Sequence, residues 1–426
     1  MSAAASLALG NSKVRSQTVQ DFTKSLAAQK ASDTVFNPSA NRVKRIAEII
    51  EQYDSQGFHR AGTEVDRDSA LWLVERIQQL GIEAVLKPFP LSRVDPVQAY
   101  IQIGQRRVEG IPVFDGTFTD AKGIQGTLGP LGSEADIALT QITPQLNTPK
   151  DKEFQTSRHS GRYKAIVAST HGQRPGLAPI NAKDFVSPFG PPVLQVTSEE
   201  ASWLEEAAKQ GKEVVLVAQV RRTDVNAFNV TATLKGQKSN LAPLVVMTPR
   251  SGWWNCAGER GGGLACWLTV MEAFSMKKPV RDVMFVATSG HELGEMGLKS
   301  YLGQQPTLAQ TAKVWLHFGA NIGAALGKRS GLFASTEEFD QVAAAAMSKF
   351  GAPPDERFPP NSKPYGEAVL IHQRGGHYIS LLGVNKLFHH PEDRWPLAVD
   401  VDQVTRLATA FANVAIALAG EGNATS

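Results

Sequence analysis

The sequence predicts a doubly wound α/β protein with a mostly parallel sheet, interrupted by an inserted β-rich domain. From about residue 231 the chain alternates short apolar segments, such as LAPLVVM and VMFVA, with longer helical patterns. Strands without polar alternation are buried on both faces, as in parallel sheets covered by helices on each side. The length of 426 residues also exceeds one ordinary domain, so we expect two domains or three.

The first predicted helices come before the insertion. NRVKRIAEIIEQ, residues 41–52, places its apolar side chains at helical intervals. The run SALWLVERIQQLG ends at Gly81, which is a typical helix stop. A strand, IEAVLKPF, follows.

Between residues 91 and 230 the pattern changes to short strands. Alternating runs such as AYIQIG and KEVVLVAQV are separated by Gly, Pro, Asp and Ser. One helix, SEEASWLEEAAKQG, is expected within this region. The predicted divisions are an N-terminal arm at 1–40, a discontinuous catalytic α/β domain at 41–90 and 231–426, and the inserted β-rich domain at 91–230.

The second part of the α/β domain supplies most of the sheet. The strand LAPLVVM is followed by the helix GGGLACWLTVMEAFSM, and the strands VMFVA and KVWLHFG come next. A helix, VDQVTRLATAFANVAIALAG, closes the pattern. Ligands of such sheets bind beyond the carboxyl ends of the strands, so we expect the site in the loops there.

The composition of the chain limits the kinds of molecule that it is expected to bind. The formal charge is only +3 and no basic block is interleaved with aromatics, which argues against nucleic acid. No apolar run reaches the roughly 18 residues that span a bilayer. Two cysteines and a poor secretory signal favour a cytoplasmic location. We therefore expect a small-molecule or peptide-like substrate and no membrane partner, and the sequence is compatible with a homo-oligomer.

Several groups that can bind metal follow the predicted strands. Glu259 precedes a glycine-rich helix start, Glu292 follows VMFVA, and His389 lies in LFHHPED. Two carboxylates and an imidazole suit zinc, manganese or iron with one position open for water. The zincin helix motif is absent, because Glu295 stands where His-Glu-x-x-His requires its second histidine. A P-loop and a serine nucleophile elbow are absent as well.

The sequence resembles the M28 metallopeptidases, which are co-catalytic zinc aminopeptidases and their relatives. The resemblance covers most of the chain. It includes a protease-associated insert domain, whose typical ending is similar to FGPPVLQVTSEEASWLEEAAKQGKEVVLV. The core segments that carry it are MTPRSGWW, CAGERGGGLA, SGHELGEMG, HFGANIG and FHHPED.

The resemblance implies that half of a two-metal site is retained. Glu259, Glu292 and His389 stand at the three ligand positions of one metal. The resemblance also implies that the other metal has lost its ligands, because Thr248 and Arg250 replace the two residues of an expected His-x-Asp and Gly319 or Ala320 stands where an aspartate ligand is expected. We therefore expect one divalent transition metal ion (Zn, Mn or Fe) in a mononuclear site.

The remaining roles follow from this expectation. His291 is the predicted base that activates water, and Arg250 is the predicted anchor for a negative substrate group or oxyanion. His317 is expected to lean into the same pocket, and Trp253 and Trp254 to stack on a flat substrate. The predicted activity is hydrolysis of an amide or another C–N bond of a small substrate, which need not be a peptide.

Two other functions stay open at this point. The chain could be a catalytically inactive homologue that binds a ligand or supports assembly. The pocket could also support metal-free or lyase-type chemistry. The individual residues have simpler interpretations too, since Glu259 and Arg260 could form a surface ion pair at a helix start and Glu292 could cap a helix.

Overall fold

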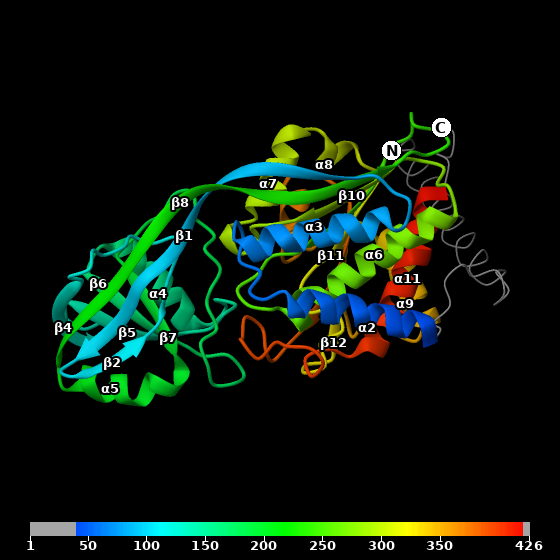
Figure 1. Cartoon of the computed structure of the whole chain (residues 1–426). Coiled ribbons are helices and arrows are strands. Elements are labelled where there is room, and N and C mark those ends of the chain that lie inside the picture. The colour runs from blue at the N-terminus through cyan, green and yellow to red at the C-terminus, as the bar shows by residue number, and fades with distance from the viewer. Residues whose placement is uncertain (1–39, 421–426) are drawn as a thin grey trace, which may run out of the picture.

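The computed structural model describes residues 40–420 and has two lobes joined by two long strands (Figure 1). Strand β1 (Ala84–Ile103) leaves the larger lobe and strand β8 (Glu213–Leu234) returns to it. The two strands are antiparallel partners from the Ala84–Ala232 pair to the Gln102–Val215 pair. The predicted boundaries at 91 and 230 therefore fall inside strands that belong to both lobes. Within the described residues, no helix combines the length and apolar character needed to cross a membrane.

The larger lobe contains a mixed, mostly parallel sheet, which confirms the predicted fold class. Its strand order is β13-β12-β14-β11-β9-β10-β8, and the central strands from β14 to β10 run parallel. Strands β12 and β8 are antiparallel to their neighbours β14 and β10. The bounds are β9 (Leu244–Pro249), β10 (Val283–Thr288), β11 (Val314–Phe318), β12 (Arg329–Ala334), β13 (Glu356–Arg357) and β14 (Tyr378–Val384).

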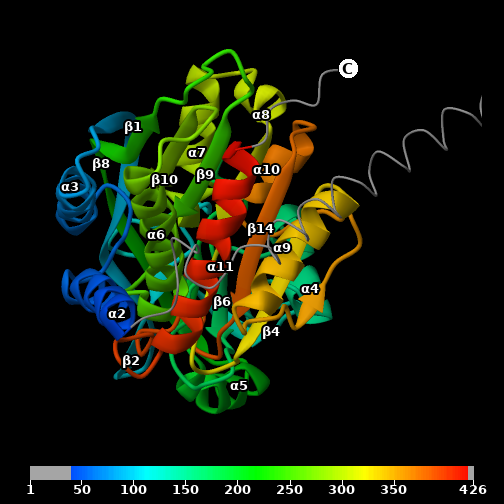
Figure 2. The same ribbon diagram turned by 90° about the vertical axis from the view of Figure 1, so that its right-hand side faces the viewer.

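Helices cover both faces of this sheet, as expected for strands whose successive residues are mostly apolar. In β9, Leu244 and Val246 pack with α2, α3, α6, α9 and α11, whereas Val245 and Met247 pack with α7, α8 and α10. Figure 2 shows α9 and α11 in front of the sheet. The helices are α2 (Ala40–Ser55), α3 (Glu64–Gln78), α6 (Gly262–Met276), α7 (Met296–Gln304), α8 (Leu308–Thr311), α9 (Glu337–Lys349), α10 (Ala368–Gln373) and α11 (Val401–Gly420).

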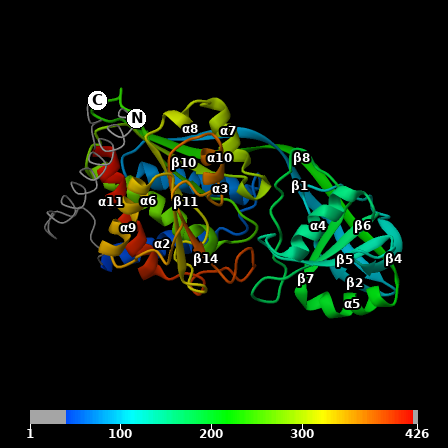
Figure 3. The same cartoon turned by 180° about the vertical axis from the view of Figure 1, so that it is seen from behind.

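The smaller lobe is built on the outer halves of β1 and β8. Strands β4, β5, β6 and β7 form a parallel set that joins β8 through β4, and two helices pack on it (Figure 3). Thr148 begins α4 with a complete capping box to Asp151. The bounds are β2 (Arg106–Glu109), β3 (Ile111–Pro112), β4 (Ile124–Pro130), β5 (Ile137–Ile142), α4 (Pro149–Ser160), β6 (Ala165–Thr170), β7 (Val193–Thr197), η1 (Ser198–Glu200) and α5 (Ala201–Lys209).

The helices and strands anticipated from the sequence occur close to their expected positions. The helix expected at the start of the domain is α2, the one within the insertion is η1 followed by α5, and the last one is α11. The predicted N-terminal arm lies outside the described residues, except for Ala40, which begins α2.

Candidate functional site

The candidate residues meet beyond the carboxyl ends of four parallel strands. The loop after β9 leads into the π-helical turn η2 (Ala257–Gly261), which carries Glu259. The loop after β10 leads into η3 (His291–Leu293). Strand β11 carries His317, and the loop after β14 carries His389. Ligands of open α/β sheets bind at this edge, so the predicted position of the site agrees with the topology.

The centre of the site is an ionic group formed by Glu259, Arg260 and His389. The Arg260 Nη2 atom lies 2.8 Å from Glu259 Oε1, and His389 Nε2 lies 3.5 Å from the same oxygen. All three side chains are about 1% exposed. Burial alone would raise the pKa of Glu259, but Arg260 and His389 outweigh it and hold the pKa at about 2. Glu259 is therefore a carboxylate, and the Glu259–Arg260 pair is buried rather than on the surface.

The second ring nitrogen of His389 fixes its tautomer. Its Nδ1 atom lies 2.6 Å from the carbonyl oxygen of Pro179, which can only accept a hydrogen bond. Nδ1 therefore carries a proton, and Nε2 faces the Glu259 carboxylate. A proton on Nε2, a cation or a donor group is then needed between this nitrogen and the carboxylate.

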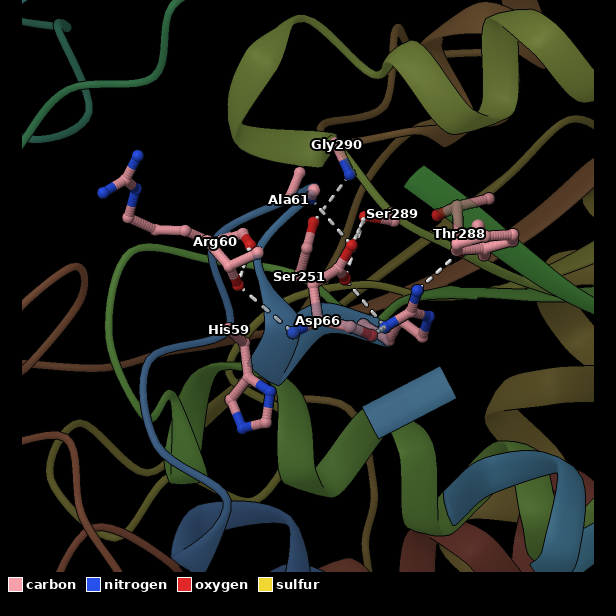
Figure 4. A network of polar contacts seen from close by, with 12 residues as sticks. His59, Arg60, Ala61, Asp66, Ser251, Thr288, Ser289 and Gly290 are labelled. Atoms are coloured by element: carbon pink, nitrogen blue, oxygen red, sulfur yellow. Dashed lines mark hydrogen bonds and ion pairs between the residues drawn. The ribbon is translucent and has the colours of Figure 1, made fainter. Parts of the chain in front are cut away.

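Glu292 is held away from this pair by hydrogen bonds of its own. The backbone N–H of Ala61 donates to Glu292 Oε1 at 2.7 Å, and the Ser251 hydroxyl donates to Oε2 at 2.6 Å. The Ser251 oxygen in turn accepts from the Gly290 N–H at 2.8 Å (Figure 4). Burial raises the pKa of Glu292, and these hydrogen bonds oppose the increase. Both oxygens of Glu292 thus bind the surrounding loops.

The Arg250 guanidinium is bound by the protein itself. Nη1 donates to the Asp66 carboxylate at 2.8 Å and to the Asp66 carbonyl at 2.7 Å, and Nη2 donates to the Phe228 carbonyl at 2.5 Å. The Ser289 hydroxyl donates to the same carboxylate of Asp66 (Figure 4). Arg250 and Asp66 are 0% and 1% exposed. The charge expected to anchor a substrate is therefore neutralised by Asp66, and the guanidinium beside Glu259 belongs to Arg260.

Two further histidines and the carboxyl group of Glu367 border the ionic group. His291 Nδ1 lies 3.9 Å from Glu367 Oε1, and the Thr288 hydroxyl donates to Glu367 at 2.7 Å. Burial raises the pKa of Glu367 to about 8. Burial and the charge of Arg260 lower the pKa of His291 well below its usual value and that of His317 to about 3, so both rings are neutral near pH 7.

Several buried polar atoms in and around this group have no hydrogen-bond partner within the described part of the chain. They are both carboxylate oxygens of Glu259, Nη1 and Nη2 of Arg260, Nδ1 of His291, Nε2 of His317 and Nε2 of His389. Buried polar atoms are nearly always hydrogen-bonded, so a cluster of this kind indicates a site for a ligand.

The predicted three-ligand metal site is not assembled. Of the expected ligands only Glu259 and His389 are adjacent, because Glu292 is directed to Ala61 and Ser251. Among residues 40–420, no three His, Cys, Asp or Glu side chains are arranged to hold an ion. The Arg260 guanidinium pairs with Glu259 and also interacts electrostatically with Glu292. These residues as placed do not fit the mononuclear centre.

A segment of the inserted lobe closes over the site. The carbonyl oxygens of Pro175 and Pro179 bind His390 and His389 at 2.7 and 2.6 Å. The Ala182 N–H donates to the carbonyl oxygen of Glu292 at 2.8 Å. These contacts explain why the central side chains are almost fully buried. The segment 175–182 therefore forms a cover over the candidate site.

The two predicted stacking residues lie beneath and beside this cover. Trp253 is buried, and its indole N–H donates to Asn181 Oδ1 at 3.0 Å. Trp254 is partly buried and donates to the carbonyl oxygen of His389 at 2.8 Å. Trp253 thus links the α/β domain to the cover, and Trp254 positions the His389 backbone.

A cleft of about 460 Å³ lies between the lobes, and no residue of the ionic group lines it. It is bordered by residues 143–145, 147 and 171–173 of the insertion and by Asn321, residues 383–386 and Phe388 of the larger lobe. The Phe388 ring stacks on His389 with centroids 3.9 Å apart, and the Asn321 N–H donates to the Glu259 carbonyl at 2.9 Å. The cleft therefore reaches residues that contact the site directly.

Several residues of the site were not predicted from the sequence. Arg260 stands beside Glu259 in the sequence, where a surface ion pair was one of the interpretations left open. Asp393 accepts from the backbone N–H groups of Gly258 and Glu259 at 2.9 and 2.8 Å and so fixes the turn that carries Glu259. Glu367 and Asp66 are distant in sequence, and only the tertiary fold brings them to the site. The short run FHHPED contains Asp393 and was the one available signal for it.

This geometry defines an α/β protein with a zinc aminopeptidase-like fold. It is similar to the zinc aminopeptidase BSAP from Bacillus subtilis, with a TM-score of 0.72 and 17% identity over 90% of this chain and 96% of that one. It is similar to an M28 peptidase precursor from Shewanella amazonensis SB2B, with a TM-score of 0.70 and 16% identity over 96% and 97% of the two chains.

A third similar structure is an aminopeptidase from Aneurinibacillus sp. strain AM-1, with a TM-score of 0.67 and 16% identity over 89% and 94% of the chains. No protein-family model matches the sequence, and no curated protein matches it. The likeness to known structures therefore establishes the fold over most of each chain.

Proposed function

We propose that this protein is a peptidase-like hydrolase that cleaves an amide or related C–N bond of a small substrate. The observation that carries the proposal is the cluster of buried polar atoms without partners around Glu259, His291 and His389. Such atoms destabilise a fold unless a ligand or water satisfies them, so their concentration at a strand-end site favours a functional role. The aminopeptidases with the same fold supply the reaction class.

The side chains divide into complementary roles. His291 is neutral near pH 7, so its free Nδ1 can accept a proton from a water molecule that attacks the substrate carbonyl carbon. The same proton can then pass to the leaving nitrogen as the C–N bond breaks. The Glu259 carboxylate can accept a hydrogen bond from a substrate N–H group. The proposal assigns no step to a metal.

The cover and the cleft support a small substrate. The site is closed by residues 175–182, and the adjacent cleft of about 460 Å³ has the size of a small-molecule pocket. An extended polypeptide would require the cover to move. We therefore place a dipeptide, an amino-acid amide or an N-acyl amine ahead of a protein substrate.

The experiment is a screen of the full-length protein against aminoacyl anilides, dipeptides, amino-acid amides and N-acyl amino acids, with product amines detected by mass spectrometry. We expect cleavage of at least one class by the wild type and a loss of at least 100-fold in His291→Ala. His372→Ala is the matched control, because His372 contacts Tyr378 and is not part of the ionic group. Equal turnover by His291→Ala and wild type would contradict the proposal.

A ligand-binding protein without catalysis is the second candidate. It is favoured by the hydrogen bonds that hold both oxygens of Glu292 away from Glu259. In this case the screened compounds would bind saturably, as measured by calorimetry, and would be recovered intact. Binding without product therefore selects this alternative.

A further inference from the structure

Arg260 is fixed in the site with most of its hydrogen-bonding capacity unused. Its Nε–H donates to the Ser251 carbonyl oxygen at 2.7 Å, which sets the plane of the guanidinium. Nη2 forms the ion pair with Glu259, yet neither Nη1 nor Nη2 has a hydrogen-bond partner within residues 40–420. A planar fork of N–H donors is thus presented to the interior of the site.

The backbone explains how two adjacent residues both point inward. Glu259 and Arg260 lie on the π-helical turn η2, with Gly258 before them and Gly261 after them. A Cβ atom at Gly258 would lie 2.5 Å from Asp393 Oδ1, so only glycine allows Asp393 to approach this turn. Asp393 then holds the N–H of Glu259, and the turn is fixed by a buried carboxylate. The carboxylate–guanidinium pair is therefore built into the loop.

The charges around Arg260 are those that a metal site would need. Glu259 lies at 2.8 Å and Glu292 interacts through space, and both carboxylates stabilise the charged guanidinium, which stays protonated at every physiological pH. The distance of 3.5 Å between Glu259 Oε1 and His389 Nε2 is close to the roughly 3.4 Å that separates two ligands about 2.1 Å from a tetrahedral zinc ion. Glu259 and His389 are thus spaced as two zinc ligands would be, and the Arg260 guanidinium lies beside Glu259.

We propose that the Arg260 guanidinium takes the place of a metal ion in this site, neutralising Glu259 and presenting Nη1 and Nη2 to the substrate carbonyl oxygen. The second part rests on the proposed hydrolase function, because the N–H fork would stabilise the oxyanion that forms when water attacks an amide. The first part is independent of any substrate. A divalent ion between Glu259 and His389 would adjoin this fixed positive charge, and the repulsion would weaken its binding.

Zinc binding tests the proposal without a substrate. Full-length wild type, Arg260→Ala and the double variant Arg260→Ala/His389→Ala are purified without chelator, analysed for metal content and titrated with Zn²⁺ by calorimetry. We expect no zinc at this site in the wild type and about one equivalent in Arg260→Ala. The double variant should lose that equivalent, which separates the site from zinc bound by surface histidines.

The titration of the wild type keeps the test decisive even if Arg260→Ala fails to fold. One equivalent of zinc in the wild type that is lost in His389→Ala would overturn the proposal. A folded Arg260→Ala protein that takes up no zinc would overturn it too, because the guanidinium would then not be what excludes the ion. Absence of amide cleavage would count against the hydrolase alone and leave the zinc result standing.

Discussion

Replacing Arg250 by methionine should destabilise the fold strongly. The substitution keeps much of the side-chain length but leaves the Asp66 carboxylate without its cationic partner, at a site where both residues are buried to 99% or more. It also removes the donors to the carbonyl oxygens of Asp66 and Phe228. Removing one member of a buried ion pair costs about 3–5 kcal/mol. We expect a loss in this range in the free energy of unfolding.

Thermal unfolding gives a second measure of the same effect. With an unfolding entropy of about 2.1 cal/mol/K per residue, a cooperative unit of roughly 380 residues shifts by about 4–6 °C for 3–5 kcal/mol. Calorimetry and denaturant unfolding monitored by circular dichroism would both detect this change.

The matched control is Arg329→Met. Arg329 pairs with Glu356 at 3.5 Å, but the two side chains are 60% and 51% exposed, so the variant should change the stability by less than about 0.5 kcal/mol. If Arg250→Met were as stable as the wild type, the role of Arg250 in stabilising the fold would be refuted. If that variant also no longer bound or cleaved a substrate, the predicted role of Arg250 as a substrate anchor would be supported instead.

Three further predictions concern the surroundings of the site. Burial raises the pKa of Glu367 from 4.5 to about 8, so its contribution to the stability of the fold is full below pH 4.5 and falls as the pH rises to 8. The unfolding free energy of the wild type minus that of Glu367→Gln should therefore decrease over this pH range. A difference that stays constant would contradict this prediction. Asp393→Ala should lower the free energy of unfolding by about 1–3 kcal/mol, measured in urea, because two buried backbone N–H groups lose their acceptor, and an unchanged midpoint would refute this role. His390→Ala should speed amide hydrogen exchange in residues 175–182, since the cover loses its hydrogen bond at Pro175, whereas His372→Ala should not.

Local patterns were sufficient to predict the architecture. The apolar strands β9, β10 and β11 and the helices α2, α6 and α11 have periodicities that depend only on neighbouring residues. The short helices α8 and α10 and the edge strand β13 carry too few residues for such a signal. Their positions depend on packing against the sheet, which a single sequence does not encode locally.

The meeting of these loops at one edge of the sheet could be predicted from the sequence, but the orientation of their side chains could not. Parallel topology brings the loops that carry Glu259, Glu292 and His389 to one edge of the sheet. Whether a carboxylate points to a shared centre depends on partners such as Ala61 and Ser251, which lie 231 and 41 positions from Glu292. A hydrogen bond across such a separation leaves no trace in residue spacing.

The resemblance to two-metal peptidases pointed to Arg250 as a replacement for a missing cation. Arg250 stands in the segment where a metal ligand was expected, and this suggested that it replaces the missing charge. In the structure Asp66 neutralises Arg250, while the Thr248 hydroxyl donates to the Phe318 carbonyl oxygen at 2.9 Å. Both replacements are thus satisfied by neighbouring loops.

A difference in hydrogen bonding separates the two arginines. Both terminal nitrogens of Arg250 are bound by protein oxygens, and only Nε lacks a partner among the described residues, so this residue mainly stabilises the loops. Arg260 is anchored only through Nε and keeps both terminal nitrogens free of hydrogen bonds within the described chain. Of these two buried guanidinium groups, only that of Arg260 has terminal N–H donors without a hydrogen-bond partner among the described residues. The stability of Arg250→Met and the zinc affinity of Arg260→Ala should therefore change independently, because each variant removes a different charge pair.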